Sequence, residues 1–533
     1  MLTHDCRHLY VCALVDEDDA LDDFLDDFDA NGLLSLHICA ENIRDSVHDF
    51  LATVTGLRTL DLAQLCWKIP EGVEPLSMTC DPLPAFPAMS CQPRILKFCS
   101  RFARTYDSRG CVSRMHATRS SFATLLAQLD VSQIEGLEIG AEALSLPIAS
   151  AYTWSSLREL VITGYWMHPH DDPGTFQDPR SRTPASIHAH VHIGTLLVAA
   201  PRLLILRIHC RYNTSSPHPY CVVWPGDDST THQGTGIRTL DTFELYNPTA
   251  MDGVYAQLPP TLRTLSLLSQ PHCTSRTTES RFTTTLRANE TDFARGVLTP
   301  AALMRMLSAT ALPDLRDLRL SFRDLTDMRL CEFIADSFPR LEFLELHAEA
   351  GAQVLWRAPE LSACARALVP LVHLQNLRLN TFRSALSVER WQWVQRRDPD
   401  ESPEQRAREG IALPDIISAL FGRHEGDSTD GRGGGTIEST EDTSAGEMHG
   451  DMCRRWPALR EIWLPQTVTH VGRYNMSTSH REWGVYSVHR NGDGSMGLHK
   501  SGSNVPIEED DASRSQKAFG PSGTEFIAYA SYA

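Results

Sequence analysis

The sequence predicts an α/β solenoid, a curved horseshoe in which parallel strands line the concave face and helices cover the outer face. Three observations lead to this prediction. A six-residue formula, Leu-x-x-Leu-x-Leu with aliphatic or aromatic exchanges, recurs along the chain; apolar residues at helical spacing precede many copies; and proline stands just before several of them. Because 533 residues exceed the roughly 100 to 200 residues of one globular domain, the chain must be multidomain or repetitive.

The six-residue unit predicts a short strand. Its clear copies begin at Leu33, Leu57, Ile134, Leu157, Leu203, Leu240, Leu262, Leu315, Leu341, Leu374 and Leu459, a further copy begins at Cys6, and a weaker one begins at Pro93. The apolar fourth and sixth residues alternate with polar ones, which is the period of a strand with one buried face. Several copies follow one another after 22 to 26 residues, the spacing of leucine-rich repeats.

The segments between the units predict helices. Apolar residues at helical spacing form one stripe at Ile43, Val47, Phe50, Leu51 and Val54, and another at Leu330, Phe333, Ile334 and Phe338. A proline that ends the helix stands two residues before the strand's first leucine at Pro201, Pro260, Pro313, Pro339 and Pro457. The alternative is a doubly wound α/β protein, but its strands, buried on both faces, would be near-continuous apolar runs.

We expect the solenoid to occupy about residues 1–470. Polar insertions with loop-forming composition interrupt it at about 164–187, 211–236, 269–298, 381–412 and 424–451. Residues 471–500 predict a capping hairpin, because Trp483–Arg490 and Ser495–Lys500 flank the turn sequence Asn-Gly-Asp-Gly. Residues 501–533 predict a flexible tail.

Five segments resemble the irregular repeats of fungal F-box/leucine-rich-repeat proteins, for example Gly-Leu-Arg-Thr-Leu-Asp-Leu; they are 56–62, 156–162, 200–208, 338–346 and 456–464. The resemblance covers roughly residues 1 to 465 as an architecture and transfers no functional residue. It implies that the repeats hold a protein substrate for ubiquitylation and that an N-terminal F-box recruits a Skp-type adaptor. Because this chain opens almost directly on a repeat, we expect no N-terminal F-box. The alternative is a stand-alone scaffold or regulatory protein with no ubiquitin link.

Two later segments resemble the start and the end of an F-box. They are Leu413–Phe421 and Cys453–Leu459. The stretch between them is too long and too rich in glycine for a compact module, and Leu459 itself begins a unit that fits the repeat formula. We therefore interpret this region as one repeat split by an insertion, with Leu413–Phe421 as its helix.

Two motifs suggest metal sites, and each has a simpler interpretation. Asp27–Gly32 begins like a calcium-binding loop, but the twelfth position is Ile38, where a bidentate glutamate is required. Zinc could bind the alternating histidines His188, His190 and His192, yet they lie in an expected outer helix and lack a third ligand of suitable spacing. We interpret both motifs as solvated helix faces and predict no metal.

Composition argues against several classes of function. The formal net charge of −18 disfavours nucleic-acid binding, which needs clustered Lys and Arg. We expect no membrane association, since no segment reaches about 20 predominantly apolar residues and the start shows no secretory signal. The 14 scattered cysteines, such as Cys331 and Cys364 at small apolar positions, indicate buried thiols in a reducing compartment, so we expect an intracellular protein, cytoplasmic or nuclear. Catalytic and phosphate-binding motifs are absent, so we predict no enzyme and no cofactor.

The fifth residue of each unit is expected to point to the concave face, where stacked repeats form a column. In chain order this column is Tyr10, His37, Asp61, Lys97, Glu138, Val161, Arg207, Glu244, Ser266, Arg319, Glu345, Arg378 and Trp463. The second position is rich in arginine, at Arg7, Arg58, Arg158, Arg263, Arg316 and Arg460. Arginine and aromatic residues are enriched at binding hot spots.

These two columns together predict a patch that binds a protein partner. Its residues are Arg316, Arg319, Glu345, Arg378, Arg460 and Trp463. The hypothesis is that the patch binds an acidic or aromatic segment of the partner. The alternative is a solvated sheet face with no dedicated partner.

Overall fold

The computed structural model describes residues from every predicted repeat unit. The described residues are 6–13, 25, 28, 30, 32–40, 45–62, 89–98, 110–141, 143–166, 193–212, 223–224, 235–269, 297–323, 328–349, 358–380, 456–471, 477–490, 496–500, 505–506 and 527–532. At some strand ends and in most of the chain after Leu464, only the backbone is described. The chain forms two compact units: Met1–Pro259 with Thr274–Asn289 and Phe519–Ala533, and Pro260–Cys273 with Glu290–Ala518.

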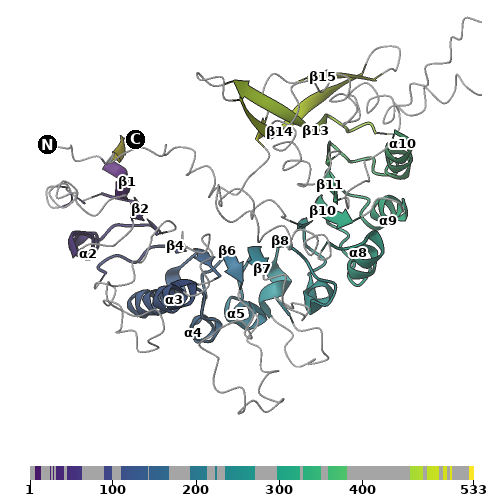
Figure 1. Ribbon diagram of the computed structural model, residues 1–533. Coiled ribbons are helices and arrows are strands. Elements are labelled where there is room, and N and C mark those ends of the chain that lie inside the picture. The colour runs from purple at the N-terminus through teal and green to yellow at the C-terminus, as the bar shows by residue number, and fades with distance from the viewer. Residues whose placement is uncertain are drawn as a thin grey trace, which may run out of the picture. The chain divides into compact units, whose positions relative to one another are not determined.

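The first unit is built on a parallel sheet whose strands follow the order of the chain. The strands are β1 (Cys6–Ala13), β2 (Ser35–Ala40), β3 (Thr59–Asp61), β4 (Ile95–Phe98), β5 (Gly136–Gly140), β6 (Glu159–Trp166), β7 (Ile205–Tyr212) and β8 (Thr242–Tyr246). One side of the sheet carries α2 (Asp45–Thr53), α3 (Gly110–Gln128), α4 (Leu146–Ser150) and α5 (Ile193–Ala199) (Figure 1).

The second unit repeats this plan. Its parallel strands are β9 (Thr264–Leu268), β10 (Asp317–Arg323), β11 (Phe343–Glu349), β12 (Asn376–Asn380) and β13 (Glu461–Val471). The helices α8 (Pro300–Leu307), α9 (Arg329–Ser337) and α10 (Ala358–Ala367) lie on one side of them (Figure 1). The prediction of an α/β fold with parallel strands is therefore confirmed.

Antiparallel strands follow the parallel ones at the end of the chain. β14 (Ser477–Arg490) pairs with β13, β15 (Met496–Lys500) and β16 (Val505–Pro506), so the two segments expected to form a hairpin do pair. The segment 501–533, which we predicted as a flexible tail, contributes β16 and also β17 (Ile527–Tyr532). In the first unit, β17 pairs antiparallel with β1. It thereby satisfies backbone groups that an edge strand would leave open.

The core of each unit is formed by the apolar positions of the repeat formula. All thirteen predicted copies form strands, including the weak copy at Pro93, which becomes β4. The fourth and sixth residue of every copy is at most 3% exposed. Since burial of one such side chain contributes about 1.5–3 kcal/mol, these two positions account for much of the stabilisation that holds helices and sheet together.

A backbone ladder joins consecutive repeats where each strand begins. The carbonyl oxygen of Leu34, at the second position, accepts hydrogen bonds from the N–H groups of Arg58 and Thr59 at 2.8 and 3.0 Å. The same pair of bonds, at 2.7–3.1 Å, recurs at the carbonyls of Arg58, Arg94, Glu135, Arg158, Leu204, Arg263, Arg316, Glu342 and Gln375. The ladder fixes the register of each strand on the strand before it.

Where we predicted α-helices, the described residues directly before two strands form 3-10 helices instead. Before β8 and β9 the chain forms the short 3-10 helices η5 (Thr235–Thr239) and η6 (Gly253–Gln257). Each of these segments contains a glycine, which disfavours an α-helix by about 1 kcal/mol relative to alanine.

Asp252 attaches part of an insertion to the core. Its carboxylate is 4% exposed and accepts hydrogen bonds from the backbone N–H groups of Val223, Trp224 and Val254 at 2.9, 2.9 and 3.0 Å. Val223 and Trp224 lie within the predicted insertion 211–236, yet both are buried. Apart from residues at their borders, the other insertions and the segment 413–421 lie outside the described residues.

Two leucines in one segment provide a matched test of the core. Leu206 is fully buried at the fourth position, whereas Leu204, at the second, is 39% exposed. Leu206→Ala should lower the free energy of unfolding by about 2–5 kcal/mol because it leaves a cavity. Leu204→Ala should change it by about 0.5 kcal/mol or less. Urea unfolding followed by tryptophan fluorescence measures both variants, and equal losses would contradict this account of the core.

Candidate binding surface

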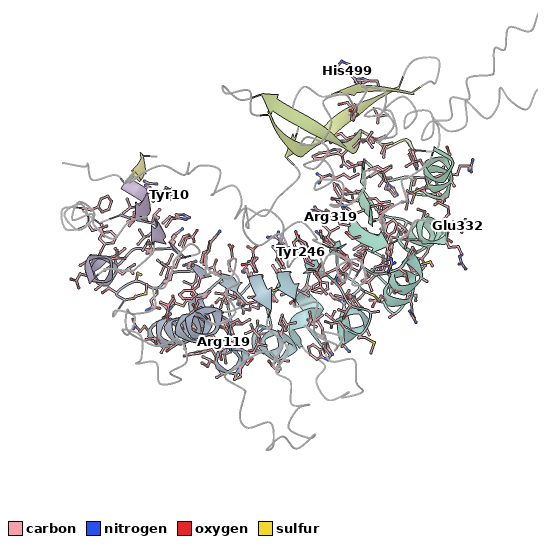
Figure 2. The ribbon with its side chains drawn as sticks, in the orientation of Figure 1. Tyr10, Arg119, Tyr246, Arg319, Glu332 and His499 are labelled. Carbon is pink, nitrogen blue, oxygen red and sulfur yellow. The ribbon has the colours of Figure 1, made fainter. Side chains whose placement is uncertain are left out.

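The fifth-position column lies on the face of each sheet opposite the helices. Figure 2 shows Tyr10, Tyr246 and Arg319 on the strand side of their units, and Arg119 and Glu332 on the helix side. Strand pairing sets consecutive members of the column side by side: Tyr10, His37, Asp61, Lys97, Glu138, Val161, Arg207 and Glu244 in the first unit, and Ser266, Arg319, Glu345, Arg378 and Trp463 in the second.

Charge alternates along much of this column, and neighbours of opposite charge form pairs. In the first unit, His37 Nδ1 lies 2.7 Å from Asp61 Oδ2, and Lys97 Nζ lies 3.0 Å from Glu138 Oε2. Val161 interrupts the alternation. Because parallel strands in register hold equal positions next to each other, each acid has a base within reach on an adjacent strand.

A denser cluster occupies β7 and β8 of the first unit. Arg207 bridges two carboxylates, with Glu159 Oε1 at 2.7 Å and Glu244 Oε1 at 3.2 Å. Glu244 also contacts His209 Nε2 at 3.0 Å, and the ring of His209 stacks on Tyr246 with centroids 3.9 Å apart. These groups fix one another on the sheet face.

Tyr10 and His37 form a second stacked pair on the same face. Their ring centroids are 4.3 Å apart and their planes differ by 12°. Tyr10 is 44% exposed, so a large part of the phenol is open to solvent. The same arrangement, a tyrosine on a histidine that contacts a carboxylate, therefore occurs at both ends of the first unit's sheet.

In the second unit, Glu345 lies at the centre of the cluster. It is 5% exposed, and its carboxylate lies 2.6 Å from His347 Nε2 and 3.4 Å from the Arg378 guanidinium. Arg319 lies 4.0 Å away on the other side. Arg319 also donates two hydrogen bonds, each 3.1 Å, to the carboxylate of Asp317. Both fifth-position arginines are thus already engaged by acids.

Aromatic rings hold the two arginines of this cluster in place. The Arg378 guanidinium carbon lies 3.6 Å from the ring centre of Trp463 and 4.7 Å from that of Phe343. Arg319 lies 5.0 Å from the same phenylalanine ring. The indole N–H of Trp463 donates to Glu461 at 2.9 Å. Guanidinium groups between rings are favourable because the ring faces attract cations.

Burial raises the pKa of the two carboxyl groups in the cluster, whereas neighbouring positive charges and hydrogen bonds lower it. Burial favours a higher pKa for Glu345, but the hydrogen bond with His347 and the charges of His347, Arg378 and Arg319 together outweigh it, and the pKa is lowered. At Asp317 burial is the largest influence and raises the pKa, against the hydrogen bond and charge of Arg319.

The structure brings together four of the six residues that we predicted for the patch. Arg319, Glu345, Arg378 and Trp463 form one cluster. The second-position arginines lie apart from it, exposed at the starts of the strands, where Arg316 pairs with Glu342 at 2.9 Å; they are Arg316 and Arg460.

Sequence reasoning missed the third- and seventh-position residues that complete the cluster. They are Asp317, Phe343, Glu461 and His347. The period of a strand could have found them, because third, fifth and seventh residues share one face.

The two motifs that suggested metal sites in the sequence are not tested by the described part of the chain. Within those residues, no group of three or more His, Cys, Asp or Glu side chains could hold a metal ion. The candidate ligands themselves lie outside the described residues; they are Asp27, Asp29, Asn31, His188, His190 and His192. None of the helices in the described ranges has the length and apolar composition that a membrane span requires.

Comparison with known proteins gives no relative from which a function could be transferred. No family model matches the chain, and no curated protein matches it. A functional conclusion therefore depends on the residues and contacts of the sheet face.

The opposite pKa shifts at Glu345 and Asp317 predict opposite pH dependences of stability. A lowered pKa contributes stability that is present above the ordinary pKa and is lost as the pH falls through the folded-state value. A raised pKa contributes stability that is present at low pH and is lost as the pH rises. The stability deficit of Glu345→Gln should therefore grow, and that of Asp317→Asn should shrink, as the pH rises from about 3 to about 7.

Urea unfolding of both variants and the unsubstituted chain over this pH range measures these deficits. Glutamine and asparagine do not titrate, so each difference isolates one carboxyl group. If the stability deficits of the two variants both grew or both shrank with pH, that would contradict the conclusion that charge dominates the pKa of Glu345 and burial dominates that of Asp317.

Proposed function

We propose that this chain is a leucine-rich-repeat solenoid that binds a protein partner through its fifth-position column. The observation that carries the proposal is the unbroken register of that column within each unit, on the sheet face opposite the helices. Repeat proteins use such stacked faces as extended binding surfaces.

Three features support the repeat type within this proposal. The strands follow chain order without rearrangement, the helices of each unit lie on one side of its sheet, and the second-position carbonyl forms the same two hydrogen bonds in successive repeats. A doubly wound protein would instead place helices on both faces. The six-residue formula and its spacing provide the independent sequence argument.

The column offers residue types and rigidity that suit recognition. Tyrosine, tryptophan and arginine are the residues most enriched at binding hot spots. Here ion pairs and ring contacts already hold Arg207, Arg319 and Arg378 in place. A partner would therefore order few additional side chains, which lowers the entropic cost of binding.

The charge of the second unit's cluster narrows the class of partner. Asp317, Glu345 and Glu461 supply three negative charges, against two positive charges from Arg319 and Arg378 and at most one from His347, so the cluster has no net positive charge. An acidic segment would gain little attraction from such a surface. We propose that the partner contributes an aromatic segment, which is the second of the two options suggested by the sequence.

A more specific form of the proposal follows from the resemblance to F-box/leucine-rich-repeat proteins. In that form the chain is the substrate-recognition component of a ubiquitin ligase. The alternative is a scaffold or regulatory protein with no link to ubiquitin. Co-purification with a Skp-type adaptor from cells that make the protein favours the first, and purification of partners without that adaptor favours the second.

Removal of one aromatic side chain from each unit tests whether the sheet face binds a protein. In the double variant Tyr10→Ala/Trp463→Ala, each unit loses one ring, and loss of a hot-spot side chain costs about 2 kcal/mol or more, roughly a 30-fold weaker affinity. The matched control is Met251→Ala/Val372→Ala, which removes two side chains that are 59% and 47% exposed in turns between strands.

Quantitative mass spectrometry of partners co-purified with the two double variants gives the result. The aromatic variant should lose its specific partners while the control retains them, with thermal unfolding as the check that both fold. Retention of the same partners at the same level by both variants would contradict binding through the column.

A further inference from the structure

Two buried thiols of the second unit face each other across adjacent helices. Cys331 belongs to α9 and Cys364 to α10, and their Sγ atoms lie 3.0 Å apart. The side chains are 1% and 2% exposed, and both thiols are free. The two helices belong to consecutive repeats and pack against each other, which keeps the two thiols close together.

Only a small movement of the two sulfur atoms is needed for a covalent bond to form between them. A disulfide has an S–S length of about 2.05 Å, so the sulfur atoms need to approach by only about 1 Å. A shift of this size is small compared with the movement that rotation about a cysteine side-chain bond produces. Cys91 and Cys210, the other described cysteines with buried side chains, lie in separate repeats of the first unit and serve as internal comparisons.

We propose that Cys331 and Cys364 are an oxidation site that forms a disulfide bond between α9 and α10 when the chain meets a peroxide. One thiol attacks hydrogen peroxide and becomes a sulfenic acid, with release of one water. The second thiol then displaces the hydroxyl group as a second water and forms the S–S bond. Two thiols together lose two electrons and two protons, and one peroxide is reduced to two waters.

The buried environment determines when this reaction takes place. The hydrogen bond with Cys331, burial and the charge of Cys331 raise the pKa of Cys364 well above its ordinary value, so the closed structure keeps this thiol protonated. The thiolate is the reactive form. Oxidation therefore proceeds while the chain folds or when the helix pair opens locally, and once formed the bond is shielded from reducing agents.

The bond would act on the part of the sheet that carries the second unit's cluster. α9 leads into β11 with Glu345, and α10 leads into β12 with Arg378. A covalent link between these helices restricts separation of the two repeats and reduces local opening of their strands. Oxidation would thus hold the Glu345–Arg378 pair together without any change in the exposed residues, whether or not the sheet face binds a partner.

The full-length chain, produced in bacteria with an oxidising and with an ordinary reducing cytoplasm, allows a direct test. Free thiols are alkylated under denaturing conditions, and tryptic peptides are identified by mass spectrometry. Each cysteine lies in its own peptide, 330–340 for Cys331 and 358–366 for Cys364. We expect these two peptides to be joined in the oxidised preparation, to separate on treatment with dithiothreitol, and Cys91 to remain alkylated in both preparations.

A second measurement reports the effect on the fold. The oxidised chain should unfold at a midpoint about 5 °C higher than the reduced chain, and hydrogen exchange in β11 and β12 should slow. Neither difference should appear in Cys364→Ala, whereas both should persist in the control Cys91→Ala. Alkylation of both peptides in the oxidised preparation, or joining of Cys331 to any cysteine other than Cys364, would overturn the proposal.

Discussion

The hydrogen-bond ladder at the second position of successive repeats is the constraint on which the rest of the structure depends. A carbonyl such as that of Leu34 accepts two N–H groups of the next repeat and leaves one register for the following strand. A slip of one residue would turn buried fourth- and sixth-position side chains to solvent. The register of the backbone therefore decides both which residues form the core and which form the opposite face.

That opposite face is ordered by its own charges. Because equal positions stand next to each other, Glu345 lies between Arg319 and Arg378, and Glu244 lies beside Arg207. Partly buried pairs of this kind gain attraction but lose hydration, so they are weak evidence for stability. Their greater effect is to hold polar and aromatic side chains in one arrangement, which is what a recognition surface requires.

The strands were predictable from the sequence, and the contacts between them were only partly so. The alternation of leucine with polar residues placed all thirteen strands, since core burial follows directly from period two. The column was predictable for the same reason. The bidentate contact of Arg319 with Asp317 and the place of Phe343 between two arginines were not, because they depend on side-chain directions. The hydrogen bond from the backbone N–H of Val223 to Asp252, 29 residues away, was not predictable either, because the composition of an insertion does not show which of its residues pack on the core.

Alternation of charge along the column has an evolutionary consequence. Repeat proteins change length by duplication or deletion of whole repeats. Deletion of the single repeat that carries Glu345 would leave Arg319 next to Arg378, and like charges on adjacent strands destabilise a sheet. Deletion of the two repeats that carry Glu345 and Arg378 would instead place Arg319 beside Trp463, so that no like charges meet. A lineage with this surface would therefore lose the repeat of Glu345 together with a neighbouring arginine repeat rather than alone.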